Sequence, residues 1–173
     1  GSMEDVLDRF YYAAYKHNPS YVVRVTTDCP LIDPYLLDEV IDCALDRNLD
    51  YFSNTLVEAF PDGQDIEVIK WSALKYTWYN AKRINEREHV SPFIRKNSTF
   101  FGGKIFTSEN FNCKYNFNKV RMTVDQIEDF DAIETLINKL GCNLDWLSYT
   151  KYILENPNLF SNQKIIRNEG SKI

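Results

Sequence analysis

Segments with the pattern of a strand alternate with segments with the pattern of a helix along this chain of 173 residues. Short runs rich in β-branched and aromatic residues predict strands, and longer segments with apolar residues at helical spacing predict helices. The alternation is typical of an α/β layered fold, whose ligands bind in the loops that follow the strands. We expect strands at residues 21–26, 51–54, 66–69, 100–107 and 120–124, and helices at 4–17, 71–82, 87–96, 127–140 and 145–156, with one more from Asp33-Pro34.

The composition favours one domain with a sizeable core, since 44% of the residues are hydrophobic. Residues 1–2 resemble a cloning scar, 3–160 form the expected domain, and 161–173 read as a loose polar tail. The net charge of −5, without a block of basic residues, argues against nucleic-acid binding. No apolar run approaches the roughly 18 residues of a membrane span, and no signal peptide is apparent, so we expect a cytoplasmic protein.

The four cysteines, Cys29, Cys43, Cys113 and Cys142, form no closely spaced pair. A zinc site needs ligands in tighter groups, and a chain with a core of this size needs no disulfide framework. We therefore expect reduced thiols.

Two aspartates follow expected strands directly. Asp28 comes after residues 21–26, and Asp125 comes after 120–124, so we expect the two strands to share one sheet and the carboxylates to meet at its edge. Carboxylate oxygens together with a triphosphate suit Mg²⁺. Each aspartate has another interpretation: Asp28 could bind local backbone N–H groups, and Asp125 could cap the helix that follows.

Three further side chains are candidates for substrate binding. Asp65 and Glu67 lie on one face of an expected strand, where they could bind sugar hydroxyls, although the pattern alone favours a solvated edge face. His89 lies in a charged cluster at a helix start, where it could orient a substrate or bind phosphate, or could be an ordinary surface histidine.

Six segments, in order along almost the whole chain, together resemble one family. The family is that of the sugar-activating cytidylyltransferases of the spore coat polysaccharide biosynthesis protein F type. The segments that carry the resemblance are residues 5–10, 24–34, 53–55 with 60–68, 86–94, 121–130 and 167–170.

The resemblance implies a Rossmann-like nucleotide-diphospho-sugar transferase fold with a mixed, mostly parallel sheet. It also implies a reaction in which a sugar hydroxyl attacks the α-phosphorus of CTP, releasing pyrophosphate, for surface polysaccharide biosynthesis. By this resemblance Asp28 and Asp125 would hold Mg²⁺, and Asp65, Glu67 and His89 would line the sugar pocket. Arg121 would contact a phosphate or a carboxylate.

The family begins with a strand and a Gly/Arg-rich loop that wraps the nucleotide triphosphate, and this sequence shows no such segment. We therefore expect an N-terminally truncated fold that binds CTP weakly and does not turn over alone. The alternative is a non-catalytic remnant used for assembly. A strand without its neighbour at residues 21–26 also predicts self-association, or pairing with the missing N-terminal half.

Overall fold

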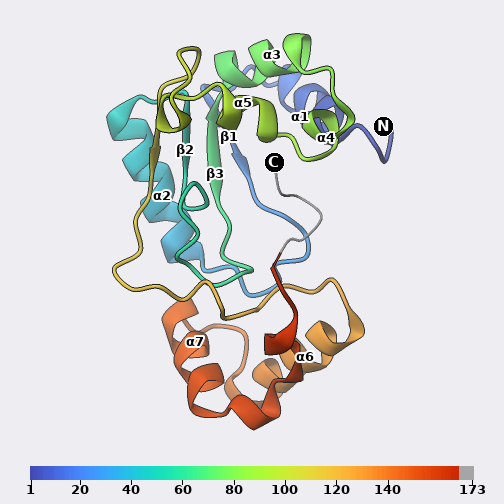
Figure 1. Cartoon of the computed structure of the whole chain (residues 1–173), viewed down its shortest axis with the longest axis vertical. Helices are drawn as coiled ribbons and strands as arrows, with labels where there is room; N and C mark the ends of the chain where they lie inside the picture. The colour runs from blue at the N-terminus through green and yellow to red at the C-terminus, as the bar shows by residue number, and fades with distance from the viewer. Residues whose placement is uncertain (168–173) are drawn as a thin grey trace.

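The computed structural model describes residues 1–167, and within them the predicted α/β class is confirmed. A four-stranded sheet has the order β1-β3-β2-β4 (Figure 1). The strands are β1 Tyr21–Arg24, β2 Tyr51–Ser53, β3 Glu67–Lys70 and β4 Ser108–Asn110. The central strand β3 runs antiparallel to both β1 and β2, and only β2 and β4 run parallel. The expectation of a mostly parallel sheet is therefore wrong, because the loop that follows β2 reverses the chain before β3.

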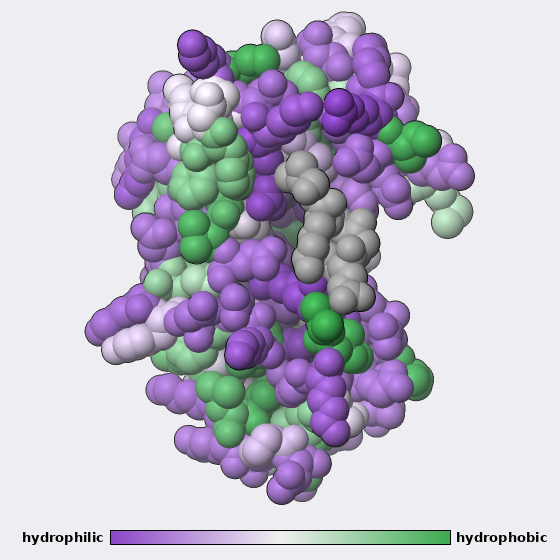
Figure 2. All heavy atoms as spheres, viewed as in Figure 1, coloured by the Kyte–Doolittle hydropathy of each residue, from purple (hydrophilic) through white to green (hydrophobic). Residues whose placement is uncertain are grey.

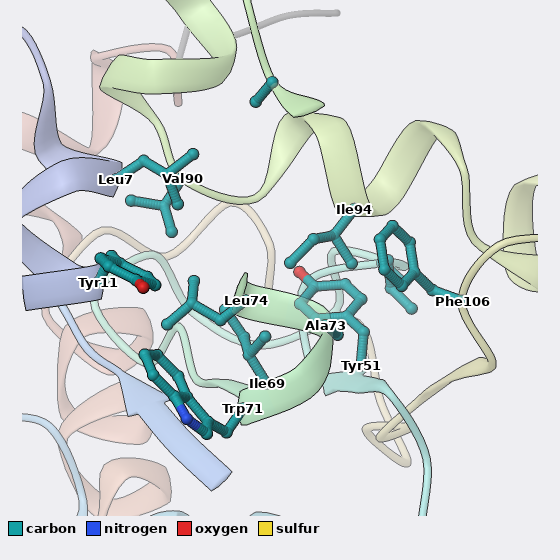
Figure 3. Close-up of a cluster of buried hydrophobic side chains, with 12 residues drawn as sticks. Leu7, Tyr11, Tyr51, Ile69, Trp71, Ala73, Leu74, Val90, Ile94 and Phe106 are labelled. Carbon is teal, nitrogen blue, oxygen red and sulfur yellow. The ribbon is translucent and has the colours of Figure 1, made fainter. Parts of the chain in front are cut away.

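Each face of the sheet packs against its own set of helices. Tyr51 and Ile69 point into a core shared with α1 (Val6–Tyr15), α3 (Trp71–Asn80) and α5 (Pro92–Lys96), shown in Figure 3. Phe52 and Val68 point to the opposite face, where α2 (Pro34–Arg47) covers them. Because side chains alternate along a strand, one short sheet supports both cores.

The helical segments agree with the sequence pattern where local signals are strong. Asp33 caps α2 by accepting hydrogen bonds from the amides of Tyr35 and Leu36. The predicted helix at 127–140 is α6 (Ile127–Leu140), and that at 145–156 is α7 (Trp146–Glu155). The expected helix at 87–96 is instead two short helices, α4 (Ile84–Glu88) and α5, because the chain turns at Val90 and restarts at Pro92.

Two expected strands are not observed. Residues 100–107 contain the end of the 3₁₀ helix Thr99–Phe101 and a turn, and the strand there, β4, follows at Ser108. Residues 120–124 form only an isolated bridge, between Arg121 and Asp62. The prediction that this segment shares a sheet with β1 is therefore wrong. Its buried apolar residues, Val120 and Met122, pack against α6 and α7 in a third core, and their spacing of two gives the segment the apolar pattern of a strand.

The segment from Ser161 is packed rather than loose as far as it is described. Its 3₁₀ helix, Ser161–Lys164, contacts α6, and Asn162 is fully buried. The expectation for 168–173, including most of the family-like 167–170 segment, lies outside the described residues. Within residues 1–167 the helices are too short or too polar to cross a bilayer.

Candidate functional site

A cleft of about 800 Å³ lies where the sheet, the loop between β2 and β3, and the segment around α5 come together. Figure 2 shows hydrophilic side chains over much of this face of the molecule, including the region between the part that holds the sheet and the part that holds α6 and α7. The structure brings five of the six predicted site residues to this cleft, and they are Asp28, Asp65, Glu67, His89 and Asp125. The sixth, Arg121, is not part of the cleft lining.

Asp28 is tied to the segment that precedes Asp125. The Thr123 hydroxyl donates to the Asp28 carboxylate over 2.9 Å, and the Val124 amide donates to the Asp28 carbonyl over 2.8 Å. These bonds fix the loop after β1 beside the segment that ends at Asp125. The two aspartates therefore face one cleft, although they do not end two strands of one sheet.

Arg121 is engaged by acids on three sides. Its guanidinium donates to Asp62 over 2.9 Å, to Asp125 over 2.7 Å, and to both oxygens of Asp129 over 2.8 and 2.7 Å. All three of its nitrogens are thus used, and the residue is 5% exposed. This arrangement does not support Arg121 as a contact for a substrate phosphate, because its guanidinium is already bound to three acids of the protein.

Asp129 was not singled out from the sequence, yet it organises the start of α6. Its carboxylate accepts hydrogen bonds from the backbone amides of Asp125 and Gln126. Asp129 therefore caps the helix, which was the alternative role expected for Asp125. Burial would raise the pKa of Asp129, but hydrogen bonds from Arg121 and Asn162 outweigh it and lower the pKa to about 2. The side chain of Asp125 consequently remains half exposed toward the cleft, with one oxygen bound by Arg121.

Asp65 and its neighbour Asp62 meet another arginine. Arg167 binds both oxygens of Asp65 over 2.5 and 2.7 Å and lies 3.6 Å from Asp62. Burial raises the pKa of Asp62 to about 6, with Asp65 and Asp125 adding to the shift and Arg167 and Arg121 opposing it. Burial also raises the pKa of Asp65, against the effect of Arg167.

Glu67 is buried on the central strand, so the solvated edge face that the pattern favoured is wrong for it. Arg24 donates to one oxygen over 2.8 Å, and the Tyr51 hydroxyl donates to the other over 2.7 Å. Burial would raise the pKa of Glu67, but Arg24 and these hydrogen bonds lower it below the usual value. The cleft therefore has an ionised carboxylate in its floor.

His89 reaches the cleft through an unusual turn. Val90 has φ of 69°, and the Ser91 amide donates to the His89 carbonyl over 2.8 Å, which closes a γ-turn. A β-branched residue in this conformation is strained, and the fully buried Val90 side chain in the first core, beside Leu7 in Figure 3, holds it there. The residues on either side, His89 and Ser91, both line the cleft.

The donor set suits a magnesium ion that is shared with a substrate. One oxygen of Asp125 is bound by Arg121, and one oxygen of Asp28 is bound by Thr123. The other oxygen of Asp28 has only a long contact, 4.0 Å, from the Cys29 thiol, so each aspartate keeps an oxygen that can serve as a ligand. Residues 1–167 contain no cluster of three or more metal-binding side chains. Mg²⁺ commonly takes only one or two carboxylates and completes its shell with water and phosphate oxygens, so two aspartates fit it.

Sequence reasoning missed the arginines of the cleft. Arg24, Arg95 and Arg167 all line it, and each comes from a different part of the chain. Arg24 and Arg167 lie in segments that carry the family resemblance, but the sequence does not show which acid each of them meets. The roles of Arg24 and Arg167 depend on partners 43 and 102 residues away, Glu67 and Asp65 respectively.

Comparisons with known proteins point to one family. A family model described as cytidylyltransferase matches residues 1–166. The solved structure of a cytidylyltransferase from Leptospira borgpetersenii superposes with a TM-score of 0.86 at 30% identity, covering 96% of this chain and 69% of that one.

Two curated relatives are similar over most of this chain. One is the uncharacterised protein MJ1063 of Methanocaldococcus jannaschii, 34% identical over 160 residues and 92% of this chain. The other is the spore coat polysaccharide biosynthesis protein SpsF of Bacillus subtilis, 31% identical over 142 residues and 82% of this chain. The matched part of this chain spans 63% and 57% of their respective lengths.

Proposed function

Since this chain belongs to the cytidylyltransferase family, we propose that it provides the sugar and metal side of an enzyme that activates a sugar with CTP and releases pyrophosphate. The observation that carries the proposal is the gathering of Asp28, Asp65, Glu67, His89 and Asp125 around one cleft. These residues come from segments up to 97 positions apart (28 to 125), and the fold places them together. The complete reaction is proposed for the full-length enzyme, because this chain spans only part of its relatives.

Asp28 and Asp125 are the proposed magnesium ligands. The ion, when bound, would neutralise charge on the phosphoryl oxygens of CTP. Arg121 holds Asp125 in place, and Thr123 holds Asp28, so the two carboxylates are oriented before any substrate arrives. Preorganised groups of this kind avoid the cost of reorganisation during phosphoryl transfer.

Asp65, Glu67 and His89 are the proposed walls of the sugar pocket. Asp65 and Glu67 are held by Arg167 and Arg24, so that side of the cleft presents fixed acceptors and donors suited to sugar hydroxyls. A role in surface polysaccharide biosynthesis is supported by the name of the Bacillus relative. The alternative of a non-catalytic assembly module is not favoured by the family match.

The metal assignment is tested by binding Mn²⁺, as a probe for Mg²⁺, in the presence of CTP. Electron paramagnetic resonance should show a bound ion for the wild type and a loss of about tenfold or more in affinity for Asp28→Asn and Asp125→Asn, the cost of removing one charged ligand. Asp131→Asn is the matched control, since Asp131 is an exposed residue of α6 outside the cleft lining. Equal Mn²⁺ affinity in all four proteins would contradict the assignment.

Turnover is tested with a pyrophosphate-release assay on CTP, Mg²⁺ and a panel of neutral, amino and acidic sugars. We expect the chain alone to bind CTP weakly and to release no pyrophosphate above the rate without protein. Release that Asp28→Ala abolishes would overturn this expectation and show a complete active site in the chain.

A further inference from the structure

One arginine of the cleft differs from the other two in its surroundings. Arg24 is paired with Glu67, and Arg167 is paired with Asp65. Arg95, on α5, has no acidic partner among residues 1–167. Its guanidinium instead makes long contacts to Thr55, 3.2 Å to the carbonyl and 3.5 Å to the hydroxyl, and lies over the ring of Phe101.

Arg95 also has an unsatisfied donor. Its Nε is buried, and within the described part of the chain it has no hydrogen-bond partner. A buried donor without a partner is costly, and native structures usually satisfy such groups with protein, water or ligand. The Nε atoms of Arg24 and Arg167 are unsatisfied too, but the charges of those side chains are already balanced by carboxylates.

The charge pattern of the cleft makes this position selective. Acids form part of the lining, and Asp28, which has no basic partner among residues 1–167, would repel an anionic ligand placed beside it. Glu67, the buried acid of the cleft floor, is already bound by Arg24 and Tyr51. A planar guanidinium with free donors is the group best suited to a carboxylate or phosphate, which it binds through two hydrogen bonds.

We propose that Arg95 receives an oxyanion of the substrate, either a carboxylate or phosphate on the sugar or a phosphate of the nucleotide. The proposal rests on the proposed function of the cleft and names the residue that selects an acidic substrate there. Arg95 takes the role that the sequence had suggested for Arg121, whose nitrogens are all engaged.

The test compares charged and neutral ligands in pairs by isothermal titration calorimetry. Glucuronate against glucose probes a sugar acid, and CTP against cytidine probes the nucleotide phosphates. Arg95→Gln should weaken the charged member of one pair by about tenfold or more, as expected for losing a hydrogen-bonded charge, and leave its neutral member unchanged. The pair that responds identifies the source of the oxyanion.

Arg47→Gln is the matched control, because Arg47 pairs with Glu109 and lines a separate pocket. Arg95→Lys keeps the positive charge but loses the paired N–H donors of the guanidinium. It replaces Arg95→Gln in the titrations if Arg95→Gln melts well below the wild type. The proposal is overturned if the wild type binds neither charged ligand better than its neutral partner, or if a folded Arg95 variant binds both as the wild type does. If Arg95 binds an oxyanion but the full-length enzyme shows no CTP-dependent reaction, the proposed function is contradicted and the proposal for Arg95 is not.

Discussion

Replacing Arg121 with methionine should destabilise the protein more than any loss of a surface ion pair. Arg121 donates four hydrogen bonds to Asp62, Asp125 and Asp129, and methionine preserves most of its apolar stem while removing every one. Asp129 is fully buried and Asp62 is nearly so, at 6% exposure. The substitution therefore leaves the buried Asp129 without its cation and removes the nearer of the two arginines that face Asp62.

The expected loss in free energy of unfolding is about 3–5 kcal/mol, the usual cost of removing one partner of a buried ion pair. The pKa of Asp129 gives a second estimate of this loss in free energy of unfolding. A pKa of about 2 in the folded protein, against an ordinary 3.8, corresponds to about 2 kcal/mol of stabilisation from that carboxylate alone. Because this pKa is lowered on folding, the stabilisation is present above pH 3.8 and is lost as the pH falls toward 2.

Urea unfolding at neutral pH measures the effect, with Arg47→Met as the control. Arg47 and Glu109 are each about half exposed, so that substitution should cost only about 0–1 kcal/mol. A loss below about 1 kcal/mol for Arg121→Met would refute the reasoning, because it would mean that the acids of this cluster find equivalent partners without the arginine.

Three other properties follow from the structure. Gly63 has φ of 105°, and a Cβ there would lie 2.7 Å from the Met122 carbonyl, so Gly63→Ala should cost about 2 kcal/mol or more in urea unfolding; unchanged stability would contradict this. Burial raises the pKa of Asp62 to about 6, so its contribution to the free energy of unfolding is complete below pH 3.8 and falls by about 3 kcal/mol as the pH rises to 6. Asp62→Asn should lack this part of the pH dependence, and parallel stability profiles for the two proteins would contradict the prediction. Within residues 1–167 strand β1 pairs only with β3, so its other edge should promote self-association. Light scattering that shows a monomer mass, together with a cooperative melt, would contradict this.

Local signals in the sequence were sufficient for the helices that carry them. Asp33-Pro34 marks the start of α2 through a side-chain cap and a proline that suits the first helical position. The apolar spacing of residues 127–140, ended by Gly141, defines α6 without tertiary information. These features depend on neighbours a few residues apart, and a single sequence shows those neighbours directly.

Features that depend on distant neighbours were harder to predict. Residues 120–124 have the apolar alternation of a strand because Val120 and Met122 face a core. Their main-chain partners are nevertheless Asp62 and Asp28, which lie outside β1. The antiparallel pairing of β1 with β3 likewise follows from the path of the connecting loop, which the pattern of each strand does not reveal.

In the candidate site, too, some features could be predicted from the sequence and others required the folded structure. The position of Asp28 after β1, together with the family resemblance, was enough to place Asp28 and Asp125 on one cleft. The pairing of Glu67 with Arg24 spans 43 residues, and that of Asp65 with Arg167 spans 102, so the charge balance of the cleft required the folded chain. Arg95 became a candidate only because the structure shows which arginines are already paired.

The central claim is that the nucleotide and its metal bind in the cleft that holds Asp28 and Asp125. Titration of Mg²⁺ and CTP into the ¹⁵N-labelled chain, followed by heteronuclear NMR, tests it directly and detects weak binding. The claim predicts shifts in the amides around Asp28, His89 and Asp125, greatly reduced in Asp28→Asn. Unchanged spectra, or shifts confined to the separate pocket around Arg47, would contradict it.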